Sequence, residues 1–181
     1  MAVSRRIATT GSPAKVWKLS STRPVNHPQR RLAALSILVR QWPAFRRSLG
    51  KASVDPVEKF FETLDHPFWK LHYTLAANAS PETMALIGEA RVADILANVV
   101  FPFWRVEDRD VWPDYAKLPA RLNNRRLETA ATRLFGEDPR RRQFTKTVAH
   151  QQALLQIYED FCLQDNSDCA HCPFPEQMKN W

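Results

Sequence analysis

The apolar positions along the chain follow the spacing of helices rather than strands. Pro28 fits the first turn of a helix, and the run from Arg30 to Val39 that follows is rich in apolar residues, which predicts one helix there. Shorter stretches at 42–50, 55–64 and 68–75 predict three more helices, and no stretch alternates with a period of two. The side of the first helix expected to be buried consists of Leu32, Leu35, Ile37, Leu38 and Val39.

A longer helix is predicted to begin at Ser80-Pro81 and to reach Phe103, because serine caps helices and proline fits their first turn. It is apolar on several sides, which indicates a central position. Trp112-Pro113 indicates a turn, and two further helices are expected at 121–135 and 151–162. The sequence thus predicts an all-α protein: a single compact multi-helix domain over residues 23–181, after a flexible basic leader over residues 1–22.

The size and composition of the chain agree with this predicted all-α domain. The chain has 181 residues, 44% of them hydrophobic, with six Trp and ten Phe, so it can bury a core of its own. No apolar run approaches the length of a membrane-spanning helix, and residues 1–22 contain no apolar signal region. We therefore expect no membrane association and a cytoplasmic location.

The net charge of +7 is distributed unevenly. Residues 1–54 hold 11 Lys and Arg and no acid, and residues 121–146 are the second basic segment, whereas the segments between and after them are acidic. Basic segments of this kind either pair with acidic segments inside the fold or bind phosphates of DNA or RNA. The candidate phosphate contacts are Arg30, Arg31, Arg46, Arg47, Arg140, Arg141 and Arg142.

All three cysteines, Cys162, Cys169 and Cys172, lie within eleven residues near the C-terminus. Two thiolates of a C-x2-C turn can reach one ion, and a third at a helix end supplies a third ligand. The pattern predicts a metal knuckle at 162–172 that holds zinc, with an iron–sulfur cluster and no cofactor at all as alternatives. The fourth ligand that a structural zinc site requires is not evident from the sequence.

A second candidate site is polar. His72, Asp94 and Asn98 would form a small pocket if folding brought them together, and that pocket is the basis of an enzyme alternative. In the simpler interpretation Asp94 and Asn98 hold the segment that contains Arg23 and Asn26. The sequence has no Gly-rich phosphate loop and no hydrolase or metalloprotease motif, so we assign no catalytic residue and favour a chain that is not itself an enzyme.

Motifs spread over the chain resemble those of a bacterial family known as a domain of unknown function. The matching residues are the R-P-x-N-x-P motif at 23–28, Trp69-x-x-His72-Tyr73, Asp94-Ile95-Leu96-x-Asn98, Pro102-Phe103, Gln152-x-Leu154-Leu155-Gln156 and the terminal C-x6-C-x2-C cluster. Members of that family are about twice as long, so the resemblance implies that this chain corresponds to their C-terminal half. It implies a recurring domain and supplies no activity.

We therefore expect a non-catalytic, metal-stapled structural or protein-interaction domain, which meets an N-terminal partner domain or another protein. The alternatives are a nucleic-acid-binding accessory domain that contacts phosphates through its two basic segments, and the enzyme described above.

Overall fold

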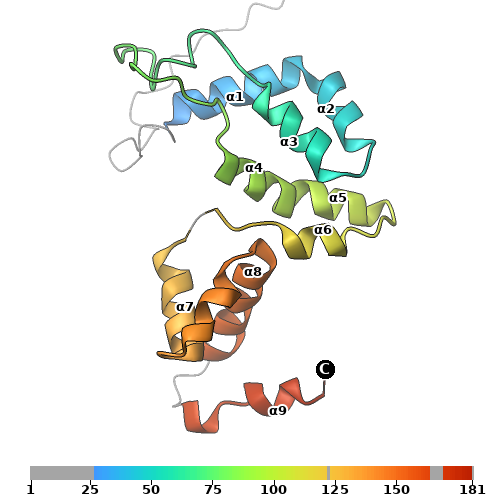
Figure 1. Ribbon diagram of the computed structural model, residues 1–181, viewed down its shortest axis with the longest axis vertical. Coiled ribbons are helices and arrows are strands. Elements are labelled where there is room, and N and C mark those ends of the chain that lie inside the picture. Colours follow the sequence, from blue (N-terminus) through green and yellow to red (C-terminus); the bar gives the residue numbers. More distant parts are fainter. Residues whose placement is uncertain (1–26, 122, 164–168, 181) are drawn as a thin grey trace, which may run out of the picture. The chain divides into compact units, whose positions relative to one another are not determined.

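The computed structural model describes residues 27–121, 123–163 and 169–180 (Figure 1). Their regular structure is helical, which confirms the predicted all-α class. Within these ranges the β-type pairing is limited to an isolated antiparallel bridge between Pro119 and Thr147. The elements are α1 (Pro28–Arg40), α2 (Trp42–Leu49), α3 (Val54–Glu62), α4 (Glu89–Ile95), η2 (Leu96–Val100), α5 (Phe101–Val106), α6 (Trp112–Lys117), α7 (Arg125–Phe135), η3 (Pro139–Thr145), α8 (Val148–Ile157), η4 (Tyr158–Leu163), η5 (Cys169–His171) and α9 (Phe174–Met178).

The chain divides into two compact units, where the sequence predicts one domain. The first unit comprises the described parts of Met1–Trp42 together with Leu64–Leu86, so α1 is its single regular helix in the described ranges. The second unit comprises Pro43–Thr63 and the described parts of Ile87–Trp181. The predicted leader, residues 1–22, lies outside the described residues.

Three predicted elements differ from the structure. Residues 68–75 form turns instead of a helix, and the helix expected from Ser80 begins only at Glu89. The backbone of this region makes long-range hydrogen bonds instead of helical ones. The N–H of Ser80 donates to the carbonyl of Leu71, and the N–H of Met84 donates to the carbonyl of Lys70. Trp112-Pro113 starts α6 rather than marking a turn, since proline in a first turn costs no hydrogen bond.

In the second unit α4, η2 and α5 run on as one continuous helix with a widened turn in the middle (Figure 1). The N–H of Phe101 donates to the carbonyl of Leu96, five residues earlier. This π-turn lies directly before Pro102, whose ring would collide with the carbonyl of Asn98 in a regular α-helix. The sequence predicts that this helix is buried on several sides, but Val99, Phe103 and Val106 are exposed.

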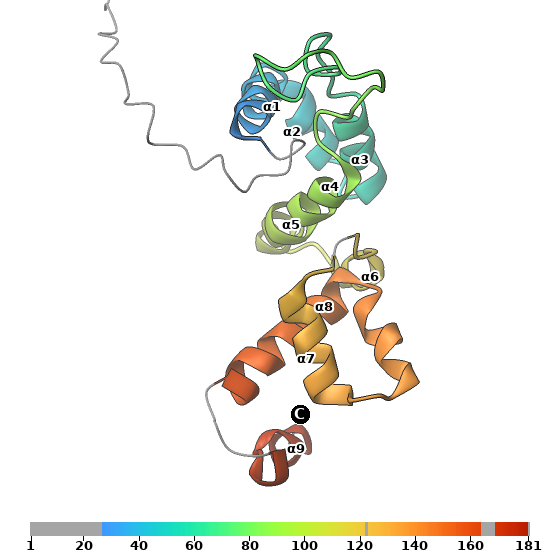
Figure 2. The same ribbon diagram turned by 90° about the vertical axis from the view of Figure 1, so that its left-hand side faces the viewer.

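Two apolar clusters hold the second unit together. In one, the rings of Phe45, Phe60 and Phe61 lie with their centroids 5.3–5.6 Å apart, joining α2 to α3. The other joins α7 to α8 through Leu127, Ala131 and Leu154, with Leu134, Phe135 and Leu155 packed against it. Figure 2 shows α7 beside α8, with η3 in contact with both.

Candidate functional site

In the first unit, three exposed apolar side chains form a row on α1. Leu32, Leu35 and Val39 are 59%, 56% and 63% exposed, and their spacing places them on one side of the helix. The prediction that these three are buried is wrong, whereas Ile37 is buried as expected. We call Leu32, Leu35 and Val39 the α1 apolar row.

The charged residues that α1 itself places beside the apolar row are positive. Arg31 and Arg40 are exposed and, by helical spacing, flank the row on opposite sides. The helix itself, Pro28–Arg40, carries no Asp or Glu. The row is therefore an apolar strip between cations.

Arg30 explains why this side of α1 faces solvent. It lies on the opposite, buried side with Ala34 and Ile37, and it is 1% exposed. Its guanidinium donates to three backbone carbonyls: those of Trp69, of His72 at 2.8 Å and of Ala85 at 2.9 Å. Burial lowers the pKa of Arg30, and among the described residues its Nε–H has no hydrogen-bond partner.

The prediction that Arg30 contacts phosphate is therefore wrong, because its charge is enclosed by the protein. The unfavourable position of a cation near a helix start does indicate a partner. That partner is a set of carbonyls rather than a carboxylate or a bound anion.

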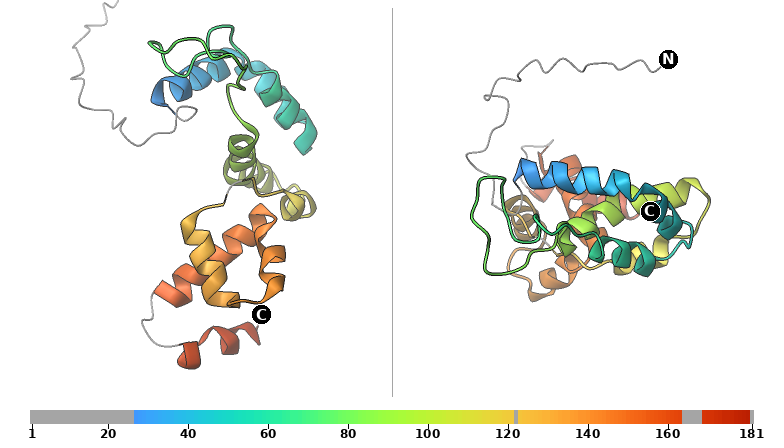
Figure 3. Two further views of the ribbon diagram at one scale, coloured as in Figure 1. Left: turned by 60° about the vertical axis from the view of Figure 1, so that its left-hand side comes forward. Right: turned by 90° about the horizontal axis from the view of Figure 1, so that it is seen from above.

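The segment that Arg30 holds, 64–86, is further tied to α1 and to itself (Figure 3). The N–H of Leu75 donates to the side chain of Gln29 at 2.9 Å. The ring of Phe68 stacks on that of His72 at 4.0 Å, and the Nδ1 of His72 lies 2.8 Å from the carbonyl of Phe68. His72 thus has a local structural role in the first unit.

The other members of the predicted polar cluster lie elsewhere. Asp94 and Asn98 belong to the second unit, so the predicted pocket is not a feature of either unit by itself. Asp94 pairs with Arg91 at 3.0 Å, and the Nδ2 of Asn98 donates to the Asp94 carbonyl. Arg23 and Asn26 lie outside the described residues.

Asn98 takes part in a polar chain that the sequence analysis missed. The hydroxyl of Tyr115 donates to the Oε1 of Gln152, and the Nε2 of Gln152 donates to the Oδ1 of Asn98 at 3.2 Å. This chain links η2, α6 and α8 beside a hollow of about 740 Å³ that Trp112 also lines. Partial burial raises the pKa of Tyr115. The motifs that carry the family resemblance include both Asn98 and Gln152, but the sequence does not show that these two side chains are in contact.

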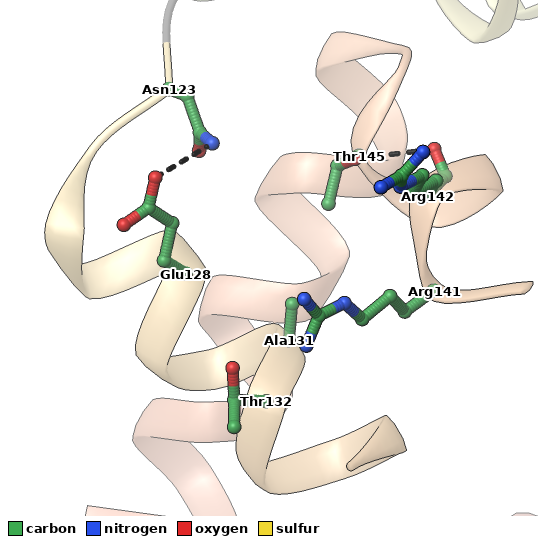
Figure 4. Close-up of a pocket in the computed structure, with 7 residues that line it drawn as sticks. All are labelled: Asn123, Glu128, Ala131, Thr132, Arg141, Arg142 and Thr145. Carbon is green, nitrogen blue, oxygen red and sulfur yellow. Dashed lines mark hydrogen bonds between the residues drawn. The ribbon is translucent and has the colours of Figure 1, made fainter. Parts of the chain in front are cut away.

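The second basic segment is partly neutralised. Arg140 holds Asp138 through several hydrogen bonds and lowers the pKa of that carboxyl to about 2. Arg141 donates to the carbonyl of Gly136 at 3.2 Å. A hollow of about 330 Å³ is lined by Arg141, Arg142 and Glu128, whose side chains are drawn in Figure 4. The phosphate-binding prediction is untested for this segment.

The cysteines lie at the C-terminal end of the second unit. Cys162 in η4 and Cys172 are half-buried, and Cys169 is exposed. Burial raises the pKa of Cys162, Arg133 lowers it, and Cys172 and Cys169 raise it. Among the residues the structure describes, no three His, Cys, Asp or Glu side chains are arranged to hold a metal. The zinc and iron–sulfur predictions remain predictions.

No helix in the described part of the chain is long and apolar enough to cross a membrane. Comparison with known proteins finds no match among curated sequences and none among solved structures. One family model does match, over residues 3–114, a range that includes α1, its apolar row and the Arg30 contacts. Its description is "Protein of unknown function (DUF2851)", and the chain belongs to this family.

Proposed function

We propose that the chain is a non-catalytic protein-interaction domain whose α1 apolar row binds an acidic amphipathic helix of a partner protein. The observation that carries this proposal is the row itself: three large apolar side chains, each more than half exposed, on one side of a helix. An amphipathic helix binds such a row by laying its own apolar side along it.

Charge selects the class of partner. Arg31 and Arg40 flank the row, and residues 1–54 contain no acid, so a partner with Asp or Glu beside its apolar residues is favoured and a basic one is repelled. Arg30 supports this role indirectly, because its buried contacts fix α1 with the row outward.

Two synthetic peptides test the proposal with the full chain. Each is about 18 residues long, about five helical turns, with leucines on one side and either Glu or Lys elsewhere. We expect the Glu peptide to bind with an affinity that falls as salt rises, and the Lys peptide to bind far more weakly, by fluorescence anisotropy.

The matched variants are Leu35→Asp and Leu75→Asp. Leu75 belongs to the same unit and is 66% exposed, but it lies off α1. Losing one buried leucine contact removes about 1.5–3 kcal/mol, so Leu35→Asp is expected to weaken Glu-peptide binding at least about tenfold. Leu75→Asp is expected to bind as the parent chain does. Equal binding by both variants, or equal binding of the two peptides, would contradict the proposal.

We also propose that a metal ion, zinc in the first instance and an iron–sulfur cluster as the alternative, joins Cys162, Cys169 and Cys172. The C-x6-C-x2-C spacing supports this, as does the contact between the rings of Phe161 and Phe174, whose centroids lie 5.0 Å apart and bring α9 to η4. Such a site would fix the C-terminal segment and leave the α1 apolar row unaffected.

Elemental analysis of the chain, purified without air, measures whether this metal site is occupied. We expect one zinc per chain, and its loss in both Cys169→Ser and Cys172→Ser, because each removes one thiolate ligand. Ala170→Ser, between the two, is the control and keeps the metal. Metal-free parent protein, or a serine variant with parental zinc and thermal stability, would rule the site out.

A further inference from the structure

We infer that the second unit has a binding site for a nucleoside phosphate, formed by Arg47, Lys51 and Lys59. These cations come from α2, from the turn between α2 and α3, and from α3, and all three line one hollow of about 510 Å³. The inference does not depend on the α1 apolar row.

The charges in this hollow are unbalanced. Asp55 is the one carboxylate that lines it, which leaves a net charge of +2. Each of the three cations is exposed, and in the described ranges none of them pairs with an acid within 4.0 Å. By contrast, Arg140 forms an ion pair with Asp138. Three unpaired cations around one hollow create a local field that attracts a multiply charged anion.

The backbone holds this arrangement in place. Two backbone hydrogen bonds close the turn between the helices. The N–H of Gly50 donates to the carbonyl of Arg46, and the N–H of Ala52 donates to the carbonyl of Leu49. Ala52 has a φ of 47°, in the left-handed region that a residue with a Cβ rarely adopts. This tight turn sets the position of Lys51 between the two helices, so the cations are not carried by a loose loop.

The chemistry favours phosphate with an organic group attached. A phosphate offers several oxygens and more charge than a carboxylate, which suits three separate cations. The hollow is larger than a bare phosphate requires, and its other lining includes Ala44, Pro56 and Phe60, against which a base or sugar can pack. The phosphate has two sources, a free nucleotide or the backbone of a nucleic acid strand.

The experiment measures binding of two fluorescent probes, a nucleoside triphosphate and a single-stranded oligonucleotide, to the full chain over a range of salt. Arg47→Gln with Lys51→Gln is the test variant. Arg125→Gln with Lys70→Gln is the control, because both residues are exposed cations that do not line the hollow. We expect the test variant to bind at least about tenfold more weakly and the control to bind like the parent, with unchanged circular dichroism for both.

The two probes distinguish the sources. Binding of the triphosphate alone assigns the site to free nucleotides. Binding of the oligonucleotide, with log K falling against log salt with a slope of roughly −2 for three neutralised phosphates, assigns it to a nucleic acid backbone. Binding of neither probe, or equal loss in test and control variants, overturns the inference. Leu35→Asp is expected to leave both affinities unchanged, which separates this site from the α1 apolar row.

Discussion

Replacing Arg30 with methionine is expected to lower the free energy of unfolding by roughly 3–5 kcal/mol. Methionine fills much of the same volume but donates no hydrogen bond. The carbonyls of Trp69, His72 and Ala85 would then lose a charged donor. The hydrogen bond to Trp69 is buried and the other two are half-buried, and a buried carbonyl left without a partner costs about 1–3 kcal/mol. Urea unfolding followed by circular dichroism measures the change.

Arg31→Met is the matched control, since Arg31 is the neighbouring residue on the same helix and is exposed. Its effect is expected to stay within about 0.5 kcal/mol. Amide hydrogen exchange adds a local test: the N–H groups of Ser80 and Met84, which bond within the 64–86 segment, should exchange faster in Arg30→Met. Equal stability of the two variants would show that Arg30 does not hold this segment.

Trp104→Ala is expected to lower the free energy of unfolding by about 3–5 kcal/mol, the usual range for deleting a large buried aromatic side chain. Trp104 is 1% exposed, and its Nε1–H donates to the carbonyl of Leu49 at 2.8 Å, linking α5 to the end of α2. Its ring also packs edge-to-face with that of Phe101, and the ring centroids lie 5.7 Å apart. The change would leave a cavity in the second unit.

Two further variants separate volume from hydrogen bonding. Trp104→Phe keeps most of the ring but removes the donor, so about 1 kcal/mol is expected, since Arg109 also donates to Leu49 at 3.3 Å. Trp112→Ala removes a tryptophan that is 65% exposed and should cost less than about 1 kcal/mol. If Trp104→Ala and Trp112→Ala prove equally stable by thermal unfolding, the placement of Trp104 in the core is wrong.

Local signals in the sequence predict much of the helix order. Pro28 in a first turn predicts the start of α1, and Gly50 follows the end of α2. Gly136 ends α7 with a φ of 55°, a conformation that favours glycine. These signals depend on neighbouring residues alone, which is why they can be read without the fold.

The burial of α1 could not be predicted in this way. The helix has apolar residues on more than one side, and the buried side is decided by Arg30, whose carbonyl partners lie 39 to 55 residues further along the chain. The position of Arg30 on one face with Ala34 and Ile37 is the signal that sequence reasoning had available and did not use. The same limit applies to the inferred phosphate site, because Lys51 and Lys59 line one hollow only once α2 and α3 have folded.

The α1 apolar row is the central claim, and nuclear magnetic resonance of its methyl groups tests it most directly. With leucine and valine methyls labelled in the full chain, the Glu peptide is added in steps. We expect the signals of Leu32, Leu35 and Val39 to shift together and saturate, while that of exposed Leu75 does not move. Shifts confined to Leu75 or to other exposed apolar residues, or no shift of the row at saturating peptide, would contradict it.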